Sequence, residues 1–119
     1  MNIGFLFDDK FLDKLNCKTV LEGNPGCWGS EYQMALLFTQ LSKEVNNTIT
    51  VFHYNKLVTF KDGIQSFIIQ SLNDIRLNDI SIFVINLTNQ LSQSQQIALE
   101  RFCRLTNSKI IFWVHCRLN

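Results

Sequence analysis

Apolar residues along the chain gather in short runs, and segments with helical spacing separate these runs. Four of the runs are nearly continuous rather than alternating, which is the pattern of strands that are covered on both faces. They are Ile3–Phe7, Thr48–Tyr54, Ile80–Ile85 and Ile110–Val114. The pattern predicts a parallel sheet in which these strands are central and covered by helices.

Three segments between the runs carry apolar residues at helical spacing. The stripes are Met34, Leu37, Phe38, Leu41 and Val45; Ile64, Phe67, Ile68, Leu72 and Ile75; and Ile97, Leu99, Phe102, Cys103 and Leu105. Strand and helix therefore alternate, as in β-α-β units with right-handed crossovers. With 119 residues, the chain is predicted to be a single α/β domain, residues 1–119, with a Rossmann-like doubly wound parallel sheet.

Two segments lie outside this alternation. Leu57–Phe60, followed by Asp62 and Gly63 as a turn signal, is a candidate for a short extra strand. The segment Asp8–Glu22 separates the first strand from a glycine-rich loop. We expect it to hold a small hairpin or an irregular excursion.

The balance of charges narrows the range of partners. Eleven Lys and Arg residues against ten Asp and Glu residues leave a formal charge of +1, which is too small for the electrostatic footprint of a nucleic-acid-binding protein. After Glu100 the charged residues are all basic: Arg101, Arg104, Lys109 and Arg117. This leaves peripheral contact with an anionic membrane open, although a solvated face is the favoured interpretation. The oligomeric state stays open.

The cysteines and the first residues of the chain bear on compartment and cofactors. Cys17, Cys27, Cys103 and Cys116 show no C-x-x-C pair and no His at metal-ligand spacing. We therefore expect reduced thiols, no metal and no cofactor. The first apolar run lacks a basic region before it and is too short for a signal peptide or a membrane span. These features indicate a cytoplasmic protein.

Glycines cluster before the first predicted helix. Pro25 and Gly26 suit the central positions of a type II turn, so the loop that begins at Gly23 is sharply bent. The loop is not a P-loop, because Gly29 rather than Lys precedes the Ser. It also lacks the first glycine of the dinucleotide fingerprint, where Asn24 stands. A nicotinamide dinucleotide site is therefore not expected.

The helix after this loop is predicted to begin at Ser30 or Glu31. Ser30 and Gln33 form a capping box, and Glu31 places a carboxylate in the first turn, where the helix dipole favours it. A loop of this kind in the first β-α connection can present N–H groups to a ligand at the carboxyl edge of the sheet. It can equally be a tight turn before a capped helix, and the residue types give both interpretations the same weight.

Polar residues follow several of the predicted strands. Asp8 and Asp9 could polarise an acceptor hydroxyl, although capping of a turn is the favoured interpretation. His53 is interpreted as a structural residue with satisfied hydrogen bonds, while His115 is left between structural and functional roles. Because the carboxyl ends of parallel strands share one edge, we expect Asp8, His53, Asn86 and His115 to cluster there. The glycine loop and the start of the helix after it should join them, through Gly26, Gly29, Ser30 and Glu31. Asp8 and Asn86 are candidate substrate-binding residues.

The stretch GNPGCWGSEYQMALLFTQLSK, from Gly23, resembles the glycine-rich loop and first helix of retaining GT-B glycosyltransferases of family 4. In that family a segment such as G-N-P-G-x-G-G-T-E-Y opens the N-terminal Rossmann-like domain. The segment IIFWVHC, from Ile110, is similar to a later strand of that domain, which ends in a His. The resemblance implies a hexosyltransferase-type enzyme that moves a sugar from a nucleotide-sugar donor to a glycan, lipid or other acceptor, without a metal.

The resemblance also implies roles for particular residues. In the family the glycine loop lies at the interdomain cleft near the donor's phosphates and sugar, which implies substrate binding by Gly26, Gly29, Ser30 and Glu31. His115 matches a position that is often near the reacting sugar and is the candidate catalytic residue. Trp28 departs from the pattern, because the family commonly has glycine at that position.

A second departure concerns the other half of the enzyme. The family's C-terminal domain, with its nucleotide pocket and paired glutamates, has no counterpart in these residues. The resemblance therefore implies an N-terminal, acceptor-side half that is inactive alone, as a fragment, a truncated product or a stand-alone binding domain, and that meets donor and acceptor only with a C-terminal half. Two alternatives stay open: a non-catalytic flavodoxin-like or receiver-like binding module, and a structural half that pairs with a separate catalytic chain.

Overall fold

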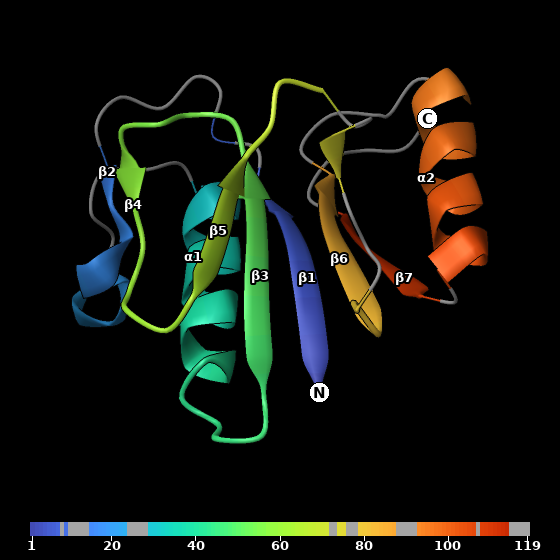
Figure 1. Cartoon of the computed structure of the whole chain (residues 1–119). Helices are drawn as coiled ribbons and strands as arrows, with labels where there is room; N and C mark the ends of the chain where they lie inside the picture. Colours follow the sequence, from blue (N-terminus) through green and yellow to red (C-terminus); the bar gives the residue numbers. More distant parts are fainter. Residues whose placement is uncertain are drawn as a thin grey trace.

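A sheet of parallel strands forms the centre of the protein (Figure 1). The computed structural model describes residues 1–7, 9, 15–23, 29–71, 74–75, 79–87, 93–106 and 108–114. Within these residues the sheet has five strands in the order β5-β3-β1-β6-β7. They are β1 (Asn2–Phe7), β3 (Thr48–His53), β5 (Gln65–Ile68), β6 (Ile82–Leu87) and β7 (Lys109–Val114).

The order of these strands defines the topology. Numbered along the chain, they follow the order 3-2-1-4-5, which is that of the first five strands of the Rossmann fold, whereas flavodoxin-like sheets follow 2-1-3-4-5. The central strand β1 pairs in parallel with β3, where Phe7 lies opposite His53, and with β6, where Ile3 lies opposite Ile82. The prediction of a parallel α/β sheet is confirmed. A flavodoxin-like or receiver-like fold has a different order.

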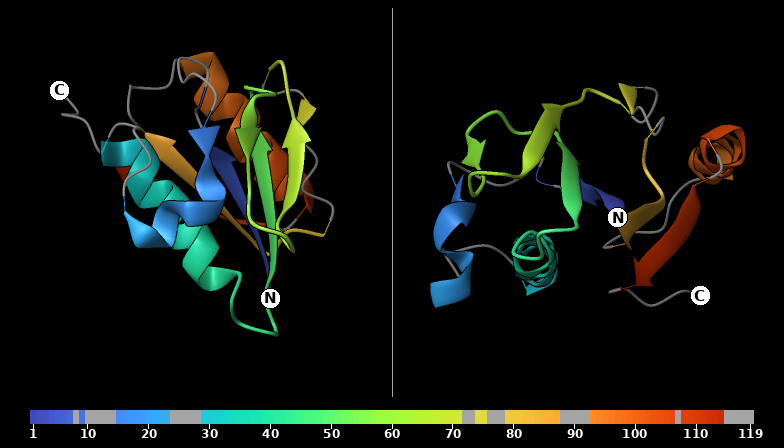
Figure 2. Two further views of the ribbon diagram at one scale, coloured as in Figure 1. Left: turned by 90° about the vertical axis from the view of Figure 1, so that its left-hand side faces the viewer. Right: turned by 60° about the horizontal axis from the view of Figure 1, so that its bottom comes forward.

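Helices lie on both faces of the sheet. Helix α1 (Gly29–Leu41) packs on the face turned away from the viewer in Figure 1, and α2 (Gln93–Thr106) lies on the opposite face beside β7 (Figure 2). Next to α1, β2 (Leu15–Asn16) and β4 (Val58–Thr59) form a two-stranded parallel sheet, and β2 leads into the 3-10 helix η1 (Cys17–Glu22). The sheet is therefore doubly wound, as predicted.

Aromatic rings dominate the core between the sheet and α1. The ring of Phe38 from α1 meets Phe5 and Phe7 from β1 with centroids 5.8 and 5.6 Å apart, and Phe60 completes the group at 5.6 Å from Phe38. Three of these rings, Phe5, Phe7 and Phe38, are fully buried. Edge-to-face contacts of this kind add to the hydrophobic stabilisation from burial.

A second core covers the other face of the sheet. Its buried members are Leu6, Phe52, Ile69, Ile75, Ile80, Phe83 and Ile85. Gly4 of β1 lies beneath this core, where a Cβ atom would be 3.1 Å from both Ile80 Cγ2 and Phe83 Cδ2. Glycine at this position therefore permits the close approach of the chain before β6 to the central strand.

The predicted helix over the stripe from Ile64 to Ile75 is wrong, because this region contains β5. Phe67 pairs with Phe52 and Ile68 pairs with His53, so the two residues belong to a strand that extends the sheet. Aromatic and β-branched residues favour strands, and in so short a run their spacing fits either structure. Pairing with β3 makes this segment a strand rather than a helix.

Other expectations need smaller corrections. The four predicted strands all form, but β7 lies at an edge of the sheet rather than in its centre. Helix α1 begins at Gly29, so Ser30 lies inside its first turn, and it ends at Leu41, so Val45 falls outside it and is 98% exposed. The extra strand predicted at Leu57–Phe60 is confirmed in shorter form as β4. The Asp8–Glu22 excursion includes β2 and η1, and β2 pairs with β4 rather than in a local hairpin.

The aromatic group predicts a large effect of Phe38→Ala on stability. We expect the free energy of unfolding to fall by roughly 3–5 kcal/mol, because the substitution leaves a cavity among three rings. Denaturant titration followed by circular dichroism measures the change. The matched control is Val45→Ala at an exposed position, which should change stability by less than about 0.5 kcal/mol; similar losses in both variants would contradict the assigned core.

Candidate functional site

The carboxyl ends of the strands share one edge of the sheet, which is the upper edge in Figure 1. Pairing places His53 beside Phe7 on one side and Ile68 on the other, and Asn86 beside Trp113. Helix α1 begins at the same edge, since it runs back toward the amino end of the next strand (Figure 1). In open α/β sheets this edge is where ligands bind.

Part of the predicted cluster is brought together at this edge. His53 ends β3, Asn86 is the penultimate residue of β6, and Gly29 and Ser30 open α1. Glu31 follows in the first turn of α1 and is buried, with 4% exposure. The remaining candidates, Asp8, Gly26 and His115, lie outside the described residues, and so does Trp28.

The best-defined polar group at the edge is a buried pair formed by Asp9 and His53. Asp9 Oδ2 lies 3.0 Å from His53 Nδ1, and the two residues are 0% and 3% exposed. The other carboxylate oxygen, Oδ1, accepts hydrogen bonds from the backbone N–H groups of Tyr54 at 2.6 Å and Asn55 at 3.0 Å. A buried carboxylate needs such partners, because an unpaired charge in the interior costs several kcal/mol.

These bonds connect the ends of two neighbouring strands. Asp9 follows β1, and its own N–H donates to the carbonyl of Phe7 at 3.1 Å. Asn55 opens the turn after β3, where its side chain accepts the N–H of Leu57 at 2.9 Å and its carbonyl accepts the N–H of Val58 at 3.2 Å. One carboxylate therefore fixes the path of the chain as it leaves both strands.

The contacts of His53 determine which nitrogen can meet a ligand. A carboxylate only accepts hydrogen bonds, so Nδ1 donates to Asp9, and in the neutral ring the lone pair is left on Nε2. Phe60 packs against the ring with centroids 4.8 Å apart at 72°. Within the described part of the chain, Nε2 has no hydrogen-bond partner. The arrangement is that of a carboxylate that orients an imidazole for hydrogen bonding or proton transfer.

Sequence reasoning found the members of this pair but not their partnership. The turn-capping interpretation of Asp9 is confirmed, since its carboxylate caps the turn after β3, and the interpretation of His53 as a hydrogen-bonded residue is confirmed at Nδ1. The available signal was an Asp after one strand and a His at the end of the strand that pairs with it. That signal requires knowledge of which strands are neighbours.

The described residues were also searched for a metal-binding group and for a membrane-spanning helix. The described residues contain no group of three or more His, Cys, Asp or Glu side chains placed to hold a metal ion. No described helix combines the length and apolar character needed to cross a bilayer. Cys17 is buried and is not in a disulfide bond.

Comparisons of the chain with protein-family models, curated proteins and solved structures find no match.

The buried pair predicts that Asp9→Ala is strongly destabilising. The substitution leaves the N–H groups of Tyr54 and Asn55 and the His53 ring without their acceptor, which should lower the free energy of unfolding by roughly 3–5 kcal/mol. Asp9→Asn keeps one carbonyl acceptor and should cost less. Chemical denaturation of both variants measures the difference, with Asp62→Ala at an exposed turn as the control; equal stability of Asp9→Ala and Asp62→Ala would refute the assigned hydrogen bonds.

Proposed function

We propose that this chain is the acceptor-side, Rossmann-like domain of a retaining GT-B glycosyltransferase of family 4 type. In this proposal the carboxyl edge of the sheet faces the cleft in which a sugar passes from a nucleotide-sugar donor to an acceptor hydroxyl. The resemblance of the Gly23–Tyr32 stretch supports the family. The strand order and the start of α1 at the carboxyl edge support the domain type.

The observation that carries the proposal is the Asp9–His53 pair at this edge. Its hydrogen bond at Nδ1 orients the ring and leaves Nε2 as an acceptor. Acceptor substrates of glycosyl transfer present hydroxyl groups, which must be aligned with the donor and must lose a proton as the new bond forms. An oriented imidazole at the cleft suits the first of these tasks and can assist the second.

The burial of His53 limits the contact that this proposal requires. At 3% exposure the His53 ring cannot contact the flat face of a sugar. A single hydrogen bond from an acceptor hydroxyl to Nε2 fits that limit. The first turn of α1 lies at the same edge and would contact other parts of the ligand.

The proposal predicts sugar binding at the carboxyl edge. Titration of the chain with glucose, galactose, mannose and N-acetylglucosamine, followed by amide chemical shifts, should perturb residues around His53, Tyr54 and Asn55 for at least one sugar. His53→Gln keeps a donor for Asp9 but removes the imidazole, and should weaken that binding by roughly fivefold or more. UDP and GDP, which lack the transferable hexose of the donor, should cause no comparable shifts at this edge.

A control at the other end of the same strand separates binding from general damage. Thr48→Ala changes the exposed first residue of β3, at the amino edge, and should leave sugar affinity unchanged. Equal affinity in the native chain and in His53→Gln would reject the role of the imidazole. Binding of UDP at this edge with no binding of any sugar would instead support a nucleotide-binding module and reject the acceptor-side assignment.

A further inference from the structure

Strand β5 forms one edge of the five-stranded sheet, and within the described residues it pairs only with β3. Its four residues, QSFI, are all exposed and carry no charge. Proteins commonly protect such an edge with Lys or Pro, because its unpaired backbone groups can pair with another strand. β5 contains neither residue type. Its edge is therefore suited to accept a further strand.

The hydrogen bond of Ile69 shows which backbone groups of β5 point away from β3. In a parallel pair, alternate residues direct both their N–H and their C=O toward the neighbouring strand. The N–H of Ile69 donates to the carbonyl of His53 at 2.7 Å, so Phe67 also faces β3, whereas Ser66 and Ile68 face outward. Both outward-facing residues are described, and none of their backbone N–H or C=O groups has a hydrogen-bond partner.

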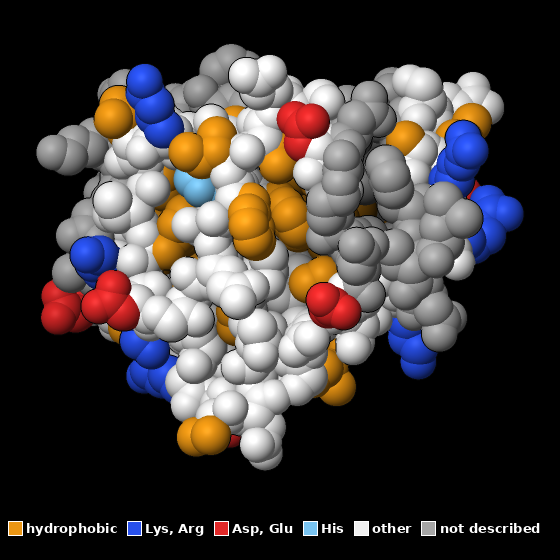
Figure 3. All heavy atoms as spheres, in the orientation of Figure 1, with side chains coloured by type: hydrophobic (Ala, Val, Ile, Leu, Met, Phe, Trp, Pro, Cys, Tyr) orange, Lys and Arg blue, Asp and Glu red, His pale blue; other side chains and the backbone are white. Residues whose placement is uncertain are grey.

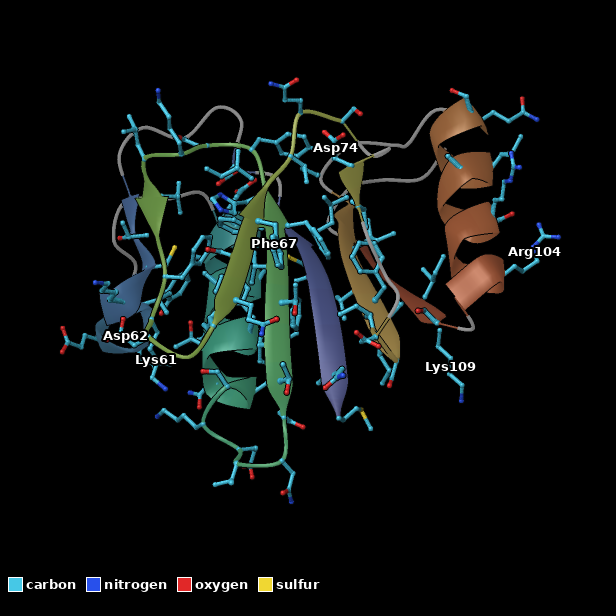
Figure 4. All side chains as sticks on the ribbon, viewed as in Figure 1. Lys61, Asp62, Phe67, Asp74, Arg104 and Lys109 are labelled. Carbon is cyan, nitrogen blue, oxygen red and sulfur yellow. The ribbon has the colours of Figure 1, made fainter. Side chains whose placement is uncertain are left out.

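The small second sheet does not continue the main sheet at this edge. β2 and β4 pair with each other, and Figure 2 shows them displaced toward α1 rather than in line with β3 and β5. The Lys, Arg, Asp and Glu side chains coloured in Figure 3 lie away from β5. In Figure 4 the ring of Phe67 lies over β5 on the face turned away from α1, with Lys61 and Asp62 below it and to the left.

The pattern of outward-facing groups is complementary to itself. When two copies pair their β5 strands in antiparallel orientation around Phe67, Ser66 of each copy lies opposite Ile68 of the other. These opposed residues can exchange both of their N–H···O=C bonds. Between them the two Phe67 residues form the non-hydrogen-bonded pair, in which side chains approach most closely. Phe67 is 52% exposed, so the pairing buries apolar surface as well as backbone groups.

We propose that two copies of this chain associate through their β5 edges, in antiparallel orientation about Phe67, to form one continuous sheet. A twofold axis suits an edge on which an uncharged strand meets its own equivalent, because directly opposed like charges would destabilise the pairing. The strand is short, so the dimer is weak, with half-association expected between about 10 µM and about 1 mM. The carboxyl edges of the two copies then point in opposite directions. The proposal does not depend on the glycosyltransferase assignment.

Analytical ultracentrifugation of the native chain tests the association. Over a dilution series from roughly 1 mM to roughly 10 µM, the sedimentation coefficient should fall from that of a dimer toward that of a 13.8 kDa monomer. Amide hydrogen exchange at the same concentrations locates the contact. Exchange at Ser66 and Ile68 should be slower in the concentrated sample, because their N–H groups become hydrogen-bonded only in the dimer, whereas Phe67 is already bonded to β3.

Two substitutions of Ser66 separate the backbone from the side chain. Ser66→Pro removes one outward N–H and leaves the bonds between β5 and β3 in place, because an edge strand tolerates Pro where the N–H faces solvent. It should weaken dimerisation by roughly tenfold or more. The matched control Ser66→Ala keeps the N–H and should change the dissociation constant by less than about twofold. Circular dichroism verifies that both variants are folded.

Charges at the axis test the register. Phe67→Lys and Phe67→Glu each place like charges opposite each other, so each variant alone should lose dimerisation. An equimolar mixture should associate at least about fivefold more tightly than either variant alone, because a Lys of one copy then faces a Glu of the other. The matched controls, Val45→Lys and Val45→Glu, change an exposed residue outside β5. They should dimerise like the native chain and gain nothing on mixing.

Three results would overturn the proposal. The first is a native chain that stays monomeric up to roughly 1 mM, because the edge then does not bind a second copy at any useful concentration. The second is a dimer that Ser66→Pro and Ser66→Ala weaken equally, because such a dimer does not use the backbone of β5. The third is a mixture of Phe67→Lys and Phe67→Glu that associates no better than either variant alone, which rejects antiparallel pairing about Phe67.

Discussion

The pairing of β1 with a parallel strand on each side is the constraint on which the rest of the structure depends. Parallel neighbours cannot be joined by a tight turn, so the chain must return to the amino edge before each new strand begins. The return path provides α1 on one face and α2 on the other. The same geometry places the end of every strand at one edge, which is why residues far apart in the sequence meet there.

The arrangement of the sheet was predictable where burial leaves a simple pattern. β1, β3 and β6 are continuous apolar runs because both of their faces are covered, and such runs are visible without knowledge of the fold. β5 is neither buried nor a continuous apolar run. Its four residues are exposed, and its apolar residues fit helical spacing. Its identity comes from hydrogen bonds to β3, which local sequence does not encode. The edge position of β7 likewise depends on the order of strands.

The candidate site was predictable in location but not in detail. The strand ends and the glycine loop are visible in the sequence, and they indicate a site at the carboxyl edge without any knowledge of which strands pair. Asp8 and Asp9, in contrast, are chemically identical, and only the path of the chain after β1 turns the Asp9 carboxylate toward Tyr54, Asn55 and His53.

The two neighbours of β1, the strands β3 and β6, lie far apart in the sequence. This separation affects the order in which the chain folds during synthesis. During synthesis β3 becomes available after His53, so β1, α1 and β3 can pack around the phenylalanine rings while the ribosome is still adding residues. The other edge of β1 must wait for β6, which ends at Leu87, and the contacts of Gly4 with Ile80 and Phe83 form only then. Until that point the nascent chain carries an unpaired strand edge under an uncovered apolar face, which is the kind of surface that chaperones bind and that promotes aggregation.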